Sequence, residues 1–154
     1  MNRAGKTGSS TLPSTDGLLT ITGIDACFEG KYAFVASFDV VNGNELNLWG
    51  AEAVDKSEGT TTGIKIEGGK ALIPIYAYTF ERDIPEEESI KSSIFSPYSG
   101  NDTVHLWVYV FDKRDVYMRM DNEVEPPLCE RSFDVIFTGG KASKTWDEGH
   151  DYQR

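Results

Sequence analysis

Short runs in which apolar and polar residues alternate recur along this chain, and most of them end at glycine, asparagine or aspartate. Alternation with a period of two puts successive side chains on opposite faces of a strand, whereas a helix repeats its apolar residues every three or four positions. The run at 103–112 is the clearest. Its two alternating sets are Val104, Leu106, Val108 and Val110, and His105, Trp107, Tyr109 and Phe111. Since both sets are largely apolar, this run predicts a central strand or one covered on both faces.

The alternation predicts seven or eight strands, at 19–24, 31–41, 45–54, 60–67, 70–80, 103–112, 131–138 and, more briefly, 141–146. Tight turns are expected at Asn42-Gly43, Gly68-Gly69 and Gly139-Gly140, because these pairs readily adopt positive φ. The 68–69 turn is expected to pair the strands on either side of it. Pro74 predicts an edge strand or a bulge, since proline cannot donate to a ladder.

The interval 82–101 breaks this rhythm and predicts the one short helix. Pro85 and three glutamates suit a first helical turn, and Ile90, Ile94 and Phe95 are expected to form its buried side. Evenly spaced strands with so little helix predict an all-β fold. We expect a two-sheet β-sandwich, Ig-like or jelly-roll-like, with a closed barrel as the alternative.

The 154-residue length fits one domain. Residues 1–16, rich in Gly, Ser, Thr and Pro, are expected to form a disordered linker, 17–147 the β-sandwich domain, and 148–154 a loose tail. The net charge of −10 argues against nucleic acid as a partner. No apolar run is long enough for a membrane-spanning helix, and residues 1–16 lack the apolar core of a signal peptide.

Cys27 and Cys129 fit no zinc or CxxC spacing. They have two open interpretations. In an oxidising compartment they can form one disulfide, worth about 4–5 kcal/mol on the loop-entropy relation. Otherwise they are two buried, unreactive thiols.

Catalytic and metal chemistry have little support in the sequence. The histidines, His105 and His150, lie in a strand and in a polar tail, and no cofactor signature is present. We therefore predict a protein that is not an enzyme and has no cofactor. A speculative calcium site lies at one hairpin, with oxygen ligands from Asp39, Asn42, Asn44 and Glu45, and a second in the loop 121–125. Solvated turn residues are the competing interpretation of both.

Rows of aromatic residues are the most informative pattern for binding. If they face outward they form a platform for sugar rings or peptide, and if they face inward they are core. The residues considered as speculative ligand contacts are Trp49, Trp107, Tyr109, Tyr76 and Tyr78. Trp49 and Trp146, near strand ends, are expected to be partly exposed.

Several phrases resemble recurring phrases of largely uncharacterised small β modules in bacterial secreted or lipoprotein-type surface proteins. They begin at Leu19 (LTITGI), Glu29 (EGKYA), Asn101 (NDTV) and Phe133 (FDVIFTGGKA), and the likeness spans about 17–146. The resemblance implies an extracellular, cell-surface or periplasmic location, with an anchoring lipid outside this sequence as one possibility.

Together these features predict a non-catalytic exported module with a binding or structural role, whose partner is a surface protein or a glycan. One alternative is a carbohydrate-binding module that uses exposed aromatics. The other is a small secreted enzyme or enzyme inhibitor. The first two differ in whether an aromatic row is exposed to solvent.

Overall fold

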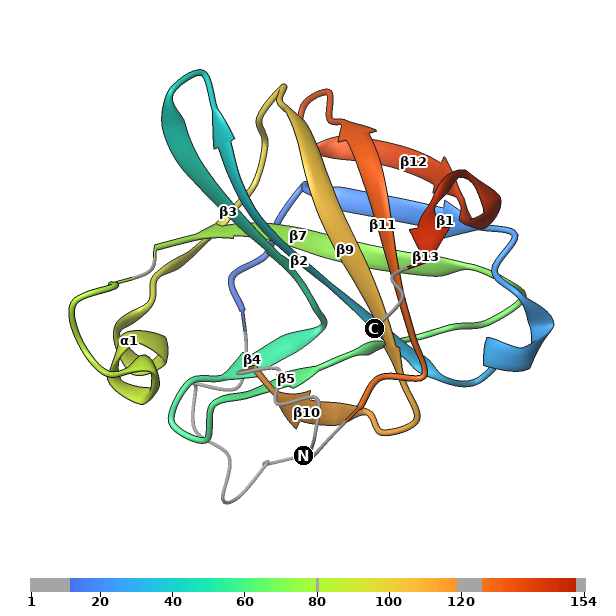
Figure 1. Cartoon of the computed structure of the whole chain (residues 1–154), viewed down its shortest axis with the longest axis horizontal. Coiled ribbons are helices and arrows are strands. Elements are labelled where there is room, and N and C mark those ends of the chain that lie inside the picture. Colours follow the sequence, from blue (N-terminus) through green and yellow to red (C-terminus); the bar gives the residue numbers. More distant parts are fainter. Residues whose placement is uncertain (1–11, 80, 119–125, 152–154) are drawn as a thin grey trace.

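The computed structural model describes residues 12–79, 81–118 and 126–151. These residues contain thirteen strands and one α-helix, so the all-β prediction is confirmed, whereas the predicted number of strands is too low. Ten strands form one large sheet and three form a small one (Figure 1). In the part of the chain described, no helix is long and apolar enough to cross a membrane.

The large sheet has the order β12-β1-β7-β3-β2-β9-β11-β13, with β6 paired to β2 and β8 paired to β7. Its pairs are antiparallel except for the parallel pair of β1 with β12. The strands are β1 (Leu18–Thr22), β2 (Tyr32–Val41), β3 (Asn44–Gly50), β6 (Ile64–Lys65), β7 (Ala71–Tyr78), β8 (Phe95–Pro97), β9 (Thr103–Phe111), β11 (Cys129–Ile136), β12 (Lys141–Thr145) and β13 (His150–Asp151).

The small sheet has the order β10-β5-β4 and consists of β4 (Ala53–Asp55), β5 (Thr60–Thr62) and β10 (Asp115–Tyr117). Two of its strands come from segments that the sequence predicted to be single longer strands. The run at 45–54 ends as β3 at Gly50 and resumes as β4, and the run at 60–67 is divided at Gly63 into β5 and β6. The two halves of each run therefore join different sheets.

The large sheet curls so that β1, β7 and β12 cross behind β9 and β11 (Figure 1). The inner face of this curl encloses a mainly aliphatic core, including Leu19, Ile73, Leu106 and Val135, with Phe133 and a few other aromatic rings. Within β9, the set Val104 to Val110 faces this core and the set His105 to Phe111 lies on the outer face. The prediction of a central strand is confirmed, because β9 pairs with β2 on one side and β11 on the other.

Two turns of identical Gly-Gly-Lys sequence are each held by a side chain from a distant segment. The backbone N–H groups of Gly68 and Gly69 donate to the Glu29 carboxylate at 2.7 and 3.1 Å. The N–H of Gly139 donates to Asn101 Oδ1 at 2.8 Å. All four glycines have positive φ, as predicted for these turns.

The strands that leave these turns diverge instead of forming hairpins, so the predicted pairing across the 68–69 turn is wrong. One isolated bridge closes each turn; beyond it β6 pairs with β2, while β7 pairs with β1 and β3. Because β7 is paired on both sides, Pro74 does not mark an edge strand. Pro74 lies just beyond the last pair with β3, where β7 changes partner.

The predicted helix is present as α1 (Glu86–Ser92), with Pro85 as its N-cap and three glutamates in its first turn. Ile90 and Phe95 are buried as expected, but Ile94 is exposed, because the helix ends at Ser92 and β8 begins soon after it.

Parts of both terminal segments make specific contacts with the sheets. In the predicted linker, residues 1–11 lie outside the described residues. Leu12 packs against a buried cluster rich in aromatic residues, and Thr15 Oγ1 donates to the carbonyl of Ile75. In the tail, His150 and Asp151 form β13, which pairs with β11 at Arg131 and Ser132. These contacts order parts of both segments that composition alone assigned as loose.

Candidate functional site

The outer face of the large sheet is divided into a covered half and an open half. In the covered half, the stacked rings of Phe34 and Trp49, with centroids 5.4 Å apart, form an aromatic cluster with Tyr76, Phe95 and Phe111. The small sheet packs against this cluster, since Val54 of β4 and Val116 of β10 belong to it. A buried hydrogen bond of 3.0 Å from Trp49 Nε1 to Thr61 Oγ1 also ties the two sheets together.

This cover changes the interpretation of the predicted ligand-contacting aromatics. Trp49 and Tyr76 are buried, so neither offers a surface to a ligand. Tyr78, Trp107 and Tyr109 are partly buried, which leaves each a partial solvent face. The expectation that Trp49 and Trp146 are partly exposed is wrong, because they retain only 3% and 1% exposure.

The open half carries a row of side chains from three adjacent strands, which we call the outer strip. It consists of Phe38 and Val40 of β2, His105 and Trp107 of β9, and Asp134 and Ile136 of β11. Its three aliphatic or phenyl members are strongly exposed, with Phe38 at 62%, Val40 at 67% and Ile136 at 70%. Exposed apolar surface on a folded domain commonly marks an interaction site, so this face is the candidate contact surface.

The strip lies where β2 and β3 separate from β9 as a projecting hairpin (Figure 1). The ladder between β2 and β9 ends at the pair Ala36 and Trp107. Beyond it, two β2 side chains replace the ladder bonds: Ser37 Oγ donates to the carbonyl of His105 at 2.8 Å, and the His105 N–H donates to Asp39 Oδ2 at 3.0 Å. These contacts fix the hairpin against β9 while leaving Phe38 and Val40 exposed.

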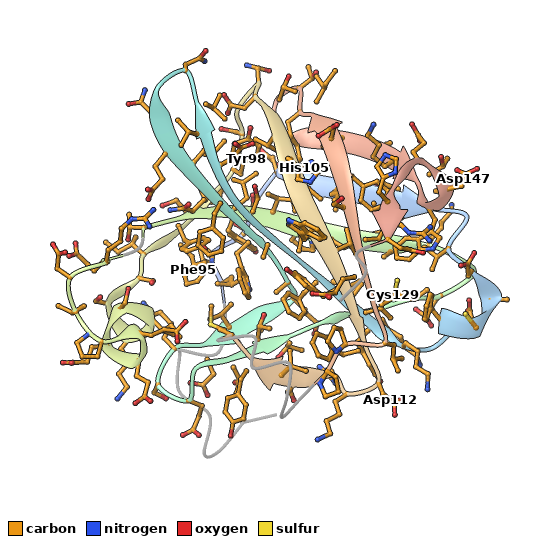
Figure 2. The ribbon with its side chains drawn as sticks, viewed as in Figure 1. Phe95, Tyr98, His105, Asp112, Cys129 and Asp147 are labelled. Carbon is orange, nitrogen blue, oxygen red and sulfur yellow. The ribbon has the colours of Figure 1, made fainter. Side chains whose placement is uncertain are left out.

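His105 and Asp134 form the charged centre of the strip, and Figure 2 labels His105 on β9. His105 Nδ1 is 2.7 Å from Asp134 Oδ1. This hydrogen bond lowers the pKa of the Asp134 carboxyl below its ordinary value. The geometry orients the imidazole ring, but the hydrogen bonds of the described residues bring no serine or cysteine to its second nitrogen. Among these residues the pair is therefore a polar contact point without an adjacent nucleophile.

Asn47 is a functional candidate that the sequence reasoning missed. It lies opposite Phe38 in the β2–β3 register and is only 5% exposed. Its Nδ2 donates to Glu45 Oε1 at 3.1 Å, whereas its Oδ1 has no hydrogen-bond partner. The signal in the sequence was an amide between Leu46 and Leu48, in the same strand as Trp49.

The four residues of the speculative calcium hairpin do not converge. Asp39 accepts from the backbone N–H groups of Val40 and His105, while Glu45 pairs with Arg82 instead. Asn42 is an exposed turn residue, and Asn44 is the exposed first residue of β3. Within the described ranges no group of His, Cys, Asp and Glu is arranged to hold a metal ion, and the second predicted loop, 121–125, lies outside them.

Cys27 and Cys129 are free thiols in this structure, one exposed and one half-buried. Cys129 starts β11, where burial is the main cause that raises the pKa of its thiol to about 11. The charges of Asp151 and Cys27 contribute to the same upward shift of the Cys129 pKa. The disulfide between Cys27 and Cys129 stays a prediction.

Searches with known protein families, with curated proteins and with solved structures found no match to this chain.

Proposed function

We propose that this protein is a non-catalytic binding module that acts outside the cytoplasm and uses the outer strip as its contact surface. The extracytoplasmic location rests on the resemblance to bacterial surface modules. The architecture that goes with this proposal is a sandwich made by one curled sheet, with the small sheet as an additional outer layer.

One observation carries the binding proposal: the outer face of a single sheet is sealed at one end and open at the other. The small sheet covers Trp49, Tyr76 and Phe111, but Phe38, Val40 and Ile136 remain exposed on the same face. Continued exposure of such side chains disfavours solubility, so a role in contact explains their presence better than packing does.

The three tryptophans allow this proposal to be tested while the ligand is unidentified. Protein labelled with 5-fluorotryptophan gives one ¹⁹F signal for each of Trp49, Trp107 and Trp146, and only Trp107 belongs to the strip. We would titrate it separately with the protein, polysaccharide and lipid fractions of bacterial envelopes. A binding module should show a saturable shift of the Trp107 signal, with Trp49 and Trp146 unchanged.

Two variants control for nonspecific effects. Phe38→Ala removes an exposed ring from the strip. Leu72→Ala removes the side chain of a β7 residue that is 53% exposed and lies outside the strip. The shift should be lost in the first variant and retained in the second. A Trp107 signal that no fraction moves, or that moves equally in Phe38→Ala, would refute binding at the strip.

A further inference from the structure

The carboxamide oxygen of Asn47 is a buried hydrogen-bond acceptor without a donor beside the outer strip. Two buried side-chain atoms in the described residues lack partners, and the other, Trp146 Nε1, lies in the inner core. Leaving such a group unpaired costs about 1–3 kcal/mol, so a protein gains stability by replacing it. Its presence next to an exposed aromatic surface points to a donor that arrives with a ligand.

Access to this oxygen is controlled by one exposed ring. Asn47 belongs to β3, between the strands of Phe38 and Tyr78, whose ring centroids are 6.1 Å apart in an edge-to-face arrangement. Tyr78 is packed against Phe95 and Trp49, with centroids 5.5 and 6.0 Å away. Phe38 is 62% exposed, so a change of its rotamer is the simplest motion that uncovers the amide.

The carboxylates around the strip already accept hydrogen bonds from this chain, and this bears on the chemistry of the ligand. Asp134 is bonded to His105, and Glu45 is bonded to both Arg82 and Asn47. Asp39 is occupied by two backbone N–H groups. A basic peptide would have to compete with these hydrogen bonds for the same carboxylate oxygens, despite the net charge of −10 for the whole chain. The local surface instead complements a neutral ligand with one apolar face and several hydroxyl groups.

We infer that the outer strip binds a neutral glycan, with a pyranose ring stacked against Phe38 and Trp107 and a sugar hydroxyl donating to Asn47 Oδ1. This inference rests on the proposed binding function and specifies its ligand. The C–H face of a pyranose contacts aromatic rings, and its hydroxyls both donate and accept hydrogen bonds. His105 and Asp134 supply additional polar contacts at the edge of the ring.

The test begins with a printed array of neutral and charged glycans that includes β-1,4-linked glucose and N-acetylglucosamine hexasaccharides. The wild-type protein should bind at least one class of neutral glycan. The affinity for that glycan is then measured by titration calorimetry for Asn47→Leu and for the control Leu72→Ala. Leu72 and Tyr78 are six positions apart on β7, which places the control about 20 Å away.

Asn47→Leu should weaken glycan binding by about tenfold or more, since a buried hydrogen bond is lost. The same variant should keep or raise the melting temperature, because it removes an unpaired buried oxygen. Leu72→Ala should leave affinity unchanged. A loss of binding with undiminished stability cannot be produced by misfolding. If Asn47→Leu does not fold, Phe38→Ala and Phe38→Tyr take its place, with binding lost in the first and kept in the second.

Binding of no neutral glycan on the array, or equal affinity of wild type and Asn47→Leu, would overturn the inference. The ¹⁹F titration of the 5-fluorotryptophan protein distinguishes a wrong ligand class from a wrong binding function. If only the protein fraction moves the Trp107 signal, the module binds a protein and the glycan assignment is wrong. If no fraction moves it, the binding function itself is wrong.

Discussion

The two faces of β9 are both apolar, but they are buried in different ways. The inner side chains, such as Leu106, are enclosed by the same sheet to which β9 belongs, because that sheet curls over them. The outer side chains depend on a separate sheet of three short strands, which covers Phe111 but leaves His105 exposed. A face closed by its own sheet is sealed along its length, whereas a face closed by an added layer is sealed only as far as that layer extends. The outer strip is the part beyond it.

The largest expected effect comes from substitutions at adjacent positions of β9. Leu106→Ala removes a fully buried side chain and should lower the free energy of unfolding by about 2–5 kcal/mol. Trp107→Ala, on the partly exposed face, should cost less than half as much despite the larger side chain removed. Urea unfolding monitored by circular dichroism measures both. Equal losses would show that the strip is part of the core.

The next prediction concerns the layer that covers the outer face. Thr61→Val keeps the shape of a buried residue but removes the acceptor of the Trp49 indole N–H. The unpaired donor should cost about 1–3 kcal/mol. Thr60→Val, on the more exposed face of β5, serves as the matched control and should change little. Hydrogen exchange should accelerate in β4 and β5 of Thr61→Val before it does so in β9; uniform acceleration would mean that the small sheet is not a separable layer.

The third prediction concerns the rates at which the two cysteines, Cys27 and Cys129, react with an alkylating reagent. In reduced protein at pH 8, iodoacetamide should modify the exposed Cys27 first. A pKa of about 11 leaves little thiolate at Cys129, and its higher nucleophilicity offsets this only in part, so its reaction should be slower by about tenfold or more. Mass spectrometry of timed samples gives both rates. In a parallel sample that has not been reduced, failure of both residues to react until a reductant is added would show that the two are joined by the predicted disulfide.

The smallest expected effect on stability comes from the contact between Arg131 of β11 and Asp151 of β13. Arg131 donates to Asp151 at 2.6 Å, and its guanidinium lies 4.5 Å from the Trp146 ring. The hydrogen bond lowers the pKa of Asp151 in the folded state, so its stabilisation is present above the ordinary carboxyl pKa and is lost as the pH falls through the folded value.

Because Asp151 is half exposed, its contribution should be below about 1 kcal/mol. Melting temperatures of wild type and Asp151→Asn, compared at pH 7 and pH 3, isolate it. The difference between the two proteins should shrink at the lower pH. A difference that does not depend on pH would assign the contact a purely structural role.

Local features of this fold were predictable from the sequence, but the partners of its strands were not. The alternation in β9 identified both of its faces, and paired glycines identified the turns at Gly68 and Gly139. Turn chemistry acts over a few residues, whereas the partner of β7 is decided by distant apolar faces, so the predicted pairing across the 68–69 turn failed.

The candidate site was predictable only in part for the same reason. Trp107 was considered as a ligand contact together with Trp49 and Tyr76, but partial exposure was expected at Trp49 and Trp146, whereas of these four only Trp107 keeps a partial solvent face. Their cover comes from strands of three residues, which are too short to show a periodic pattern. Asn47 went unnoticed because an amide within a strand has meaning only when its neighbours on both sides are known.

The side-chain clamps on the two Gly-Gly turns also bear on protein engineering. Glu29 and Asn101 fasten these turns to distant parts of the chain, so a peptide inserted at either would separate segments that hold each other. The third tight turn, at Asn42 and Gly43, projects from the body, and a side chain built on Gly43 would meet no atom within 4 Å. That tip is therefore the preferred place for a fluorescent label or an epitope tag. From there a reporter would sit at the rim of the outer strip without occupying it.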